Sequence, residues 1–538
     1  MSDMKLYNKL LLIIFVSLLS GACTQDFLDV NEDPNRAVEG NITAKLVLPQ
    51  ALLNTANRVG TSYGFLGHWL GYWCPSANYA PNAEEQTYSI TTNFGAGLFS
   101  GIMDNTYDYQ FAEVSATRDG QDFFIAVAKV MKAHNFCMLV DLYNNVPYTE
   151  AMQGLEYVRP KYDDGKLVYE ESLKQLDAAV ALLKKVTAAG GVDAVQGASD
   201  IMFGGDEKKW IKFANTLKLR YLIHQSARSD RQSYITAEIA KIVAEGSGFL
   251  GSGEDAAVAP AYTADKPNAF YASYGFNVAG NQATDFVRAN KTSIDFLKLN
   301  GDPRIGYFYK PAVSALPANA AEPFKTEAPA QFRGNEYGRP IDNSTFPYQI
   351  ANYVSQVGGV SAAGAITGAS TGLVKGYNQR VWIMTSVESM FLQAEAIQRG
   401  WLPGDKEAAY KNAVRESFRW LNVDKSASAA DAAFNSWYTQ QDENNNGNVS
   451  YADAADKLKL VLFQKYIAMN GSNHLEAWTD YRRNGAFPAI PLSINPGRTS
   501  TTLPVRLLYP QREYDLNTQA VTAVGTINQF TSKIWWMN

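Results

Sequence analysis

Residues 123–143, FFIAVAKVMKAHNFCMLVDLY, decide the fold class of this 538-residue chain. Along this segment the residues expected on a buried face recur at the 3.6-residue spacing of an α-helix, and they are Phe124, Val127, Val130, Met131, His134, Met138 and Leu142. Pro147 ends the pattern, because proline has no backbone N–H to continue a helix. The segment therefore predicts a long helix with one face in the core of the protein.

The same periodicity recurs on both sides of this segment. It predicts helices over residues 46–59, 167–185, 210–225, 234–245, 386–399, 406–421, 429–440 and 452–470. Asp206 stands where an N-cap is expected for the helix 210–225. Consecutive helices separated by short turns are typical of tetratricopeptide-like arrays, although this chain has no regular repeat. We therefore expect a mostly α fold, in which tetratricopeptide-like helix pairs form an α/α superhelical body.

Two regions do not follow this pattern. Residues 249–380 are rich in Gly, Ala, Pro, Ser and Tyr, with little helical periodicity. A connection this long is usually functional, so we expect a loop-rich variable region here. The helical scaffold would then cover about 40–248 and 381–490 within a single domain of residues 23–538. Residues 60–120, rich in Gly, Tyr, Trp and Asn, predict loops with short helices.

The N-terminus has the order of a secretory signal. Lys5 and Lys9 precede an apolar run over residues 10–19, and three small residues lead to Cys23. The run is too short to span a bilayer, which takes about 20 residues. We predict that residues 1–22 are a lipoprotein signal peptide and that Cys23 carries lipid. The alternative is an ordinary cleaved signal followed by an incidental cysteine.

Composition narrows the class of protein. The net charge of −5 argues against a nucleic-acid-binding surface. After the signal, no segment approaches 18 continuous apolar residues, so none is expected to span a membrane. Only Cys74 and Cys137 remain after Cys23, which excludes a disulfide-built scaffold and leaves open whether these two are bonded.

Aromatic residues suggest where a ligand binds. Tyr, Phe and Trp make up 12% of the chain. One cluster lies between positions 68 and 88, a second lies between 270 and 277, and both are interleaved with Gly, Asn or Pro. Because rigid rings lose little entropy when they stack on a sugar, we predict ligand contacts at Trp73, Tyr79, Tyr274, Trp69, Tyr72 and Phe276. The alternative is that these rings cover the helical core.

A second candidate site is an Asn-rich loop. Residues 442–453, DENNNGNVSYAD, follow the spacing of an EF-hand calcium loop, with Gly447 at its sharp turn. The candidate ligands are Asp442, Asn444, Asn446, Asn448, Ser450 and Asp453. Asp453 replaces the usual glutamate at the last position. The sequence thus predicts no required cofactor and one candidate ion, a structural Ca²⁺. The alternative is a helical hairpin loop without metal.

Six segments together resemble the SusD/RagB family of surface lipoproteins. They are residues 140–150 (VDLYNNVPYTE), 209–220 (KWIKFANTLKLR), 302–304 (DPR), 389–396 (SMFLQAEA), 476–485 (EAWTDYRRNG) and 506–510 (RLLYP). Their aromatic residues, such as Trp210 and Trp478, are expected in the core. Arg482 and Arg483 are expected to pair with carboxylates or to cap carbonyls.

The resemblance implies a mostly helical fold, attachment to the outer membrane and a position facing the cell exterior. It also implies nutrient binding beside a TonB-dependent transporter of the SusC type. Most members of the family bind glycans, and some bind peptides. We therefore expect a non-enzymatic lipoprotein that captures an oligosaccharide for its transporter and binds no nucleic acid.

Three other functions remain open at this point. One is a peptide-binding lipoprotein of the same architecture. Another is a surface glycoside hydrolase, which the lack of an orderly α/β or all-β catalytic pattern disfavours; the spacing of its paired carboxylates would be set in space and not along the chain. Residues 368–372 match G-x-S-x-G, but their small-residue flanks predict a loop instead of a strand and a helix around a nucleophile. The last is a pure scaffold, with its aromatic clusters buried against the transporter.

Overall fold

Helices dominate the part of the chain that the structure covers. The computed structural model describes residues 42–316, 329, 331–341 and 347–538. The predicted signal peptide, residues 1–22, and the predicted lipid attachment at Cys23 lie outside these residues. Ala44–Asn538 forms one compact unit. The prediction of a mostly α fold with successive packed helices is confirmed.

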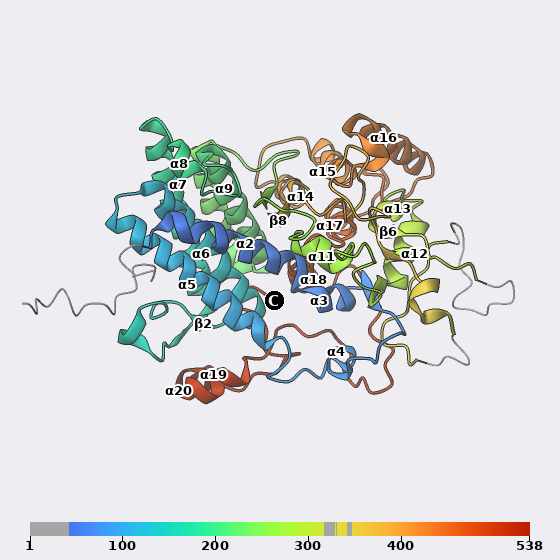
Figure 1. The fold of residues 1–538 in the computed structure, drawn as a ribbon, viewed down its shortest axis with the longest axis horizontal. Helices are drawn as coiled ribbons and strands as arrows, with labels where there is room; N and C mark the ends of the chain where they lie inside the picture. The colour runs from blue at the N-terminus through green and yellow to red at the C-terminus, as the bar shows by residue number, and fades with distance from the viewer. Residues whose placement is uncertain (1–41, 317–328, 330, 342–346) are drawn as a thin grey trace, which may run out of the picture. The chain divides into compact units, whose positions relative to one another are not determined.

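The first group of long helices comes from the N-terminal half of the chain (Figure 1). Its members are α2 (Ala44–Thr61), α5 (Ala96–Arg118), α6 (Asp122–Tyr143), α7 (Gly165–Ala188), α9 (Glu207–His224) and α10 (Gln232–Glu245). Helices near in sequence pack together: α5 contacts α2 and α6, α7 contacts α6 and α9, and α10 contacts α9. Asp206 caps α9 as predicted, because its side chain accepts a hydrogen bond from the Lys209 N–H at 3.1 Å.

The second group lies in the C-terminal half. Its members are α14 (Ser386–Gln398), α15 (Lys406–Trp420), α16 (Ala427–Glu443), α17 (Lys457–Ala468) and α18 (His474–Arg483). Here α14 packs against α15 and α17, and both α14 and α18 contact α9 of the first group. The helix predicted over 452–470 begins only at Lys457, because residues 452–456 belong to the preceding loop.

The helix α6 is the centre of the first group. By length and composition it could cross a membrane, but 83% of its most apolar window is buried inside the protein. Its neighbours α5, α7 and α9 cover it. It is therefore a core helix, and its side chains from Val130 to Tyr143 are almost all buried.

The helix α5 was missed by the sequence prediction, which expected loops with short helices over residues 60–120. Its buried face includes Asn105, Thr106 and Ser115 among the apolar residues, so the apolar stripe is interrupted. Asn105 is satisfied across the helix interface, because its Oδ1 accepts a hydrogen bond from Thr55 Oγ1 of α2 at 2.7 Å. Such a pairing between distant segments cannot be read from local periodicity.

Shorter helices connect these groups. The α-helices are α3 (Gly64–Trp69), α4 (Ala83–Thr87), α8 (Ala194–Gly197), α11 (Ala269–Tyr274), α12 (Lys291–Leu299), α13 (Ile305–Phe308), α19 (Gln511–Leu516) and α20 (Thr518–Ala523). The 3-10 helices are η3 (Gly154–Tyr157), η4 (Gln225–Ala227), η5 (Ser229–Arg231), η6 (Pro347–Gln349), η7 (Ala351–Tyr353) and η8 (Val423–Lys425). Three of the α-helices, α11 to α13, lie in the region predicted to be rich in loops.

The loop-rich region is anchored to the second helix group by Arg304. This side chain is fully buried and forms an ion pair with Asp302 at 2.6 Å. Its guanidinium also donates to Ser417 Oγ of α15 at 2.7 Å and to Gln464 Oε1 of α17 at 2.9 Å. The Asp-Pro-Arg element therefore holds the variable region onto the scaffold.

Four antiparallel strand pairs also connect distant segments. They are β1 (Trp73–Pro75) with β5 (Val287–Ala289), β2 (Val146–Pro147) with β3 (Tyr162–Asp163), β4 (Ala256–Val258) with β8 (Val381–Met384), and β6 (Tyr309–Lys310) with β7 (Gln356–Val357). In the first pair Cys74 lies opposite Arg288. This pairing brings the first aromatic cluster to the loop-rich region. Cys74 and Cys137 are both buried and free.

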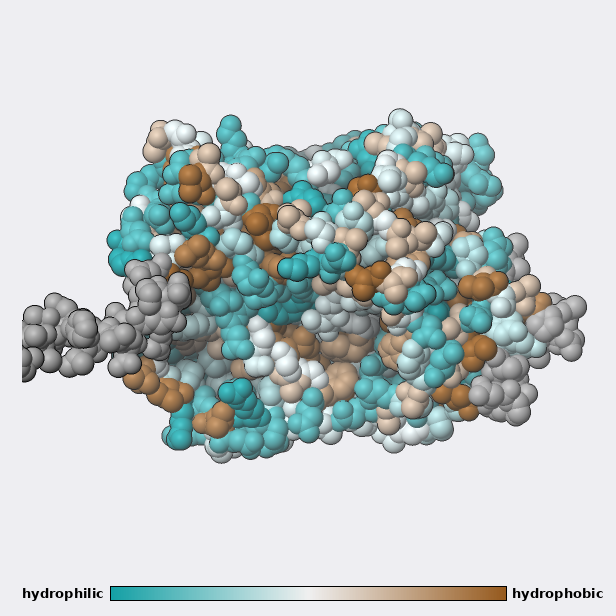
Figure 2. Space-filling view, viewed as in Figure 1, coloured by the Kyte–Doolittle hydropathy of each residue, from teal (hydrophilic) through white to brown (hydrophobic). Residues whose placement is uncertain are grey.

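Large apolar side chains on the surface are scattered over many elements. The most exposed include Leu155 at 93%, Val158 at 71% and Leu299 at 71%. Figure 2 shows brown apolar residues interspersed with teal hydrophilic ones over the visible face. Because single exposed apolar residues are ordinary on protein surfaces, they do not by themselves indicate a binding site.

Candidate ligand-binding surface

Three of the six rings predicted to contact a ligand are core residues. Trp69, Tyr72 and Trp73 are exposed by 1%, 0% and 1%. Tyr72 stacks on Tyr466 with ring centroids 4.6 Å apart, and Trp73 meets the His474 ring edge to face at 4.5 Å. No ring face is left for a sugar, so the prediction of ligand stacking at these three residues is wrong in this structure.

Two further rings show only an edge to solvent. Tyr274 of α11 is 9% exposed and packs against Trp73 and Phe270 at 5.0 and 4.9 Å. Phe276 is 8% exposed, and its ring lies beneath the Lys310 ammonium at 5.3 Å. The second aromatic cluster thus extends the core toward the surface, and its faces are not open platforms for stacking.

Tyr79 is the one predicted ring with a large exposed area, at 42%. It lies in the segment after β1, where the Ser76 N–H donates to the Phe286 carbonyl at 2.8 Å. The Tyr79 ring meets Phe286 edge to face at 5.2 Å, and its hydroxyl donates to Asp285. These contacts fix the orientation of an exposed ring.

A third segment completes the surface. The Ala77 N–H donates to the Gln349 carbonyl at 3.1 Å, and the Ala351 N–H donates to Asn78 Oδ1 at 2.8 Å. Beside them the rings of Tyr348 and Tyr353 meet edge to face at 5.2 Å. We call this region the Tyr79 surface, and it comprises Asn78, Tyr79, Asp285, Phe286, Tyr348 and Tyr353.

The polar groups of the Tyr79 surface are suited to hydroxyl recognition. The hydrogen bond to the Asp285 carboxylate raises the pKa of Tyr79, so the phenol stays protonated at neutral pH. Asp285 Oδ2 and the Asn78 amide N–H groups have no hydrogen-bond partner among the described residues. An acceptor and donors therefore flank an exposed ring.

Buried groups support this surface from below. His68 Nδ1 lies 2.6 Å from Glu85 Oε1, and the Tyr337 hydroxyl donates to the same oxygen at 2.9 Å. Burial opposes the charge of Glu85, but His68 and Tyr337 outweigh it and lower the pKa of that carboxyl. The His68 ring contacts Phe286 edge to face at 6.0 Å, so the ionised Glu85 holds the residues under the surface in place.

Tyr337 also lines a pocket of about 180 Å³. Its polar lining includes Asn290, Thr292, Asp295 and Glu336. Asp295 pairs with Lys291 and Glu336 with Arg339, so its charged groups are already compensated.

The predicted calcium loop connects α16 and α17 and is closed by its own hydrogen bonds. Ser450 Oγ donates to Asp442 Oδ1 at 2.5 Å, and the Asn448 carbonyl accepts a bond from Gln464 at 2.9 Å. In this loop the residue with left-handed backbone is Asn445, with φ of 54°, at position four. An EF-hand makes its sharp turn at the glycine of position six, which is Gly447 here.

The groups of this loop therefore do not present an EF-hand ligand set. Asn446, a further predicted ligand, donates its amide to Gln441 Oε1 at 2.7 Å. In the described part of the chain no three His, Cys, Asp or Glu side chains converge on a common point that could hold a metal. Calcium binding at Asp442, Asn444, Asn446, Asn448, Ser450 and Asp453 stays a prediction.

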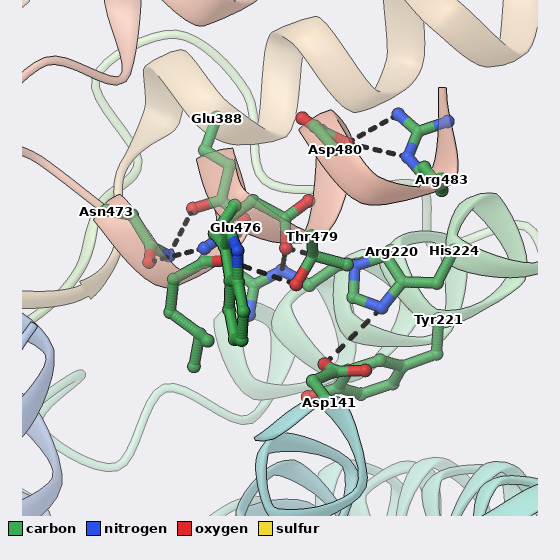
Figure 3. A network of polar contacts seen from close by, with 12 residues as sticks. Asp141, Arg220, Tyr221, His224, Glu388, Asn473, Glu476, Thr479, Asp480 and Arg483 are labelled. Carbon is green, nitrogen blue, oxygen red and sulfur yellow. Dashed lines mark hydrogen bonds and ion pairs between the residues drawn. The ribbon is translucent and has the colours of Figure 1, made fainter. Parts of the chain in front are cut away.

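A buried polar network joins α6, α9, α14 and α18 (Figure 3). His224 Nε2 lies 3.0 Å from Glu476 Oε2, and its Nδ1 lies 3.5 Å from Asp141 Oδ2. Burial opposes the positive charge of His224, but Glu476 and Asp141 outweigh that effect and raise its pKa to about 9. Arg220 pairs with Glu388. Charged groups of both signs thus compensate one another inside the protein.

The same network explains several segments quoted from the sequence. Arg483 pairs with Glu395 at 2.6 Å, and Arg482 Nη1 donates to the Asp141 carbonyl at 2.7 Å, as predicted for the two arginines. Trp210 and Trp478 are fully buried, also as predicted. These residues are buried and hold helices together.

The residues of the Tyr79 surface other than Tyr79 were missed by the sequence prediction. Asp285, Phe286, Tyr348 and Tyr353 are not clustered in the sequence with Tyr79. The available signal was the composition of residues 249–380, which marked this region as functional without indicating particular positions.

Known proteins with this fold span nearly the whole chain. A SusD homologue from Bacteroides fragilis superposes with a TM-score of 0.71 at 19% identity, covering 92% of this chain and 100% of that one. A chitin-binding SusD homologue from Flavobacterium johnsoniae gives 0.69 at 22% identity, covering 91% and 99%. A SusD/RagB family protein from Bacteroides thetaiotaomicron gives 0.69 at 21% identity, covering 92% and 99%.

No curated protein matches this chain. A family model described as starch-binding and associating with the outer membrane matches residues 34–510. The resemblance predicted from the sequence segments is thereby confirmed. The chain belongs to the SusD-like family of starch-binding proteins that associate with the outer membrane.

Proposed function

We propose that this protein binds an oligosaccharide on the Tyr79 surface and passes it, unaltered, to a SusC-like TonB-dependent transporter. The observation that carries the proposal is the geometry of Tyr79, whose ring is 42% exposed and yet fixed by Phe286 and Asp285. A ring held in place before binding loses little entropy when a sugar stacks on it.

Two further observations favour a glycan over a peptide. The groups beside Tyr79 are an acceptor, Asp285, and the amide donors of Asn78, which suit sugar hydroxyls. The relative from Flavobacterium johnsoniae binds chitin. We further propose that lipid on Cys23 anchors the protein to the outer membrane. The protein then faces the cell exterior, where it binds extracellular oligosaccharides.

Calorimetric titration with a panel of neutral and acidic oligosaccharides tests the binding site. We expect Tyr79→Ala to raise the Kd of the bound glycan at least tenfold, which corresponds to about 1.4 kcal/mol. Tyr107→Ala is the matched control, because Tyr107 on α5 is 51% exposed. Equal binding by wild type and Tyr79→Ala would overturn this site.

Further measurements test whether the ligand stays unaltered, whether a transporter binds the protein and whether Cys23 anchors it. We expect no release of reducing sugar during prolonged incubation with the bound glycan, whereas a glycoside hydrolase would release it. We also expect the full chain, extracted from outer membranes, to copurify with a large TonB-dependent barrel, and Cys23→Ser to be lost from the membrane fraction.

A further inference from the structure

Two cations near the Tyr79 surface have no carboxylate within ion-pair distance in the described part of the chain. Arg288 of β5 is 2% exposed, and its guanidinium donates to the main-chain carbonyls of Ala351 at 3.1 Å and Val287 at 2.8 Å. Lys310 of β6 is half-buried, and its ammonium lies over the ring of Phe276. Within the described ranges neither cation forms an ion pair with Asp or Glu.

This arrangement differs from that of several buried cations elsewhere in the protein. Lys465 pairs with Glu476 at 3.1 Å and Lys218 with Glu238 at 2.7 Å. A buried charge without a partner is unfavourable, because it has left water without gaining a counter-charge. Asp285 lies outside ion-pair distance of Arg288 and only partly offsets its charge, so among the described residues Arg288 and Lys310 lack a directly paired anion.

The charge of Arg288 acts on Lys310, and Arg288 itself contacts the Ala351 carbonyl beside the Tyr79 surface. Strand β7 links them, since Lys310 lies opposite Gln356 and the Ala289 N–H of β5 donates to the Ser355 carbonyl at 2.8 Å. Burial and then the charge of Arg288 lower the pKa of Lys310 to about 8. Burial lowers the pKa of Arg288 to about 10, against the opposing charge of Asp285.

The groups around Lys310 are suited to a sugar. The Phe276 ring lies beneath its ammonium, and Gln282 donates its amide to Gln356 beside it. Side-chain amides next to a cation can contact the hydroxyls and the charge of one acidic sugar residue.

We propose that Lys310, with Arg288 behind it as a buried positive charge, binds the carboxylate of an acidic sugar residue in an oligosaccharide held on the Tyr79 surface. This inference rests on the proposed function and names the class of glycan. The carboxylate forms a charge-assisted hydrogen bond with the ammonium and supplies the missing negative charge. A neutral sugar at the same place leaves both cations unpaired.

The test compares oligouronates with their methyl esters, because esterification removes the charge and keeps the sugar skeleton. Titrations use wild type, Tyr79→Ala, Lys310→Met and Lys411→Met. Methionine keeps an apolar stem over Phe276 without the charge. Lys411 is the matched control, because its ammonium also lies over a ring, that of Tyr438 at 4.4 Å, but is paired with Glu407.

We expect at least one oligouronate to bind wild type tenfold or more tightly than its methyl ester. Lys310→Met should remove this preference without weakening ester binding, and Lys411→Met should keep it. Equal binding of acid and ester by wild type, or a preference that survives in Lys310→Met, overturns the anionic subsite. If the ester binds and depends on Tyr79, the proposed function stands alone; if no oligosaccharide binds, both are overturned.

Discussion

We call the buried polar network of Figure 3 the helix joint. The helix joint and the region of the Tyr79 surface both contain buried cations, but among the residues that the structure describes these cations form ion pairs in the joint and form none near the surface. In the joint, His224, Arg220 and Lys465 each face a carboxylate. Near the surface, Arg288 and Lys310 face main-chain carbonyls and a ring. Paired charges hold the scaffold in one arrangement, whereas unpaired charges leave interaction free energy available for a ligand. Substitutions should therefore affect stability in the joint and binding at the surface.

The largest effect is expected when the joint loses one carboxylate. Glu476→Gln removes the charge that faces Lys465, His224 and Arg220 at 3.1, 3.0 and 3.6 Å. Since breaking a buried ion pair leaves uncompensated charge, the free energy of unfolding should fall by about 3–5 kcal/mol. Chemical denaturation followed by circular dichroism measures this change.

The control for this change is Glu407→Gln, which breaks an exposed pair with Lys411. It should change stability by less than about 0.5 kcal/mol. Equal losses in the two variants would mean that the joint is not held by its charges.

The joint should also make stability depend on pH. The folded-state pKa of His224, about 9, is above that of an unfolded histidine, about 6.5. The stabilisation is therefore complete below pH 6.5 and is lost as pH rises toward 9, with a slope of at most about 1.4 kcal/mol per pH unit. Denaturation of wild type and His224→Gln at several pH values measures this slope, which should be smaller in the variant.

A smaller effect of rising pH is expected on ligand binding at the surface. Above pH 8 Lys310 loses the proton that a carboxylate needs, because its pKa in the free protein is about 8. The cation facing it is Arg288 of β5, which stays charged, and Gln356 of β7 is neutral. Raising the pH from 7 to 9 should weaken oligouronate binding by about tenfold. Titrations with the methyl ester, or with Lys310→Met, should show no such change.

The same contrast explains what the sequence could predict. Helices such as α6 and α9 were predicted because local apolar spacing is enough to place their buried faces. Trp69, Tyr72 and Trp73 were assigned to a ligand and are core, because burial depends on partners such as Tyr466 and His474 hundreds of positions away. Phe286 and Lys310 were missed for the same reason, since strand pairings between distant segments bring them to the site.

The loop at residues 442–453 should give the smallest effect. Several of its oxygens already take part in hydrogen bonds within the protein, as between Ser450 and Asp442, so calcium would have to break these bonds to bind. An EF-hand with a Kd near 10 μM would gain about 2.7 kcal/mol of stability at 1 mM Ca²⁺. We expect a gain in the free energy of unfolding of less than about 0.5 kcal/mol. It is measured as the difference between unfolding in 1 mM Ca²⁺ and in EGTA. A gain near the larger value, lost in Asp442→Asn, would show that the loop rearranges around the ion as the sequence pattern predicts.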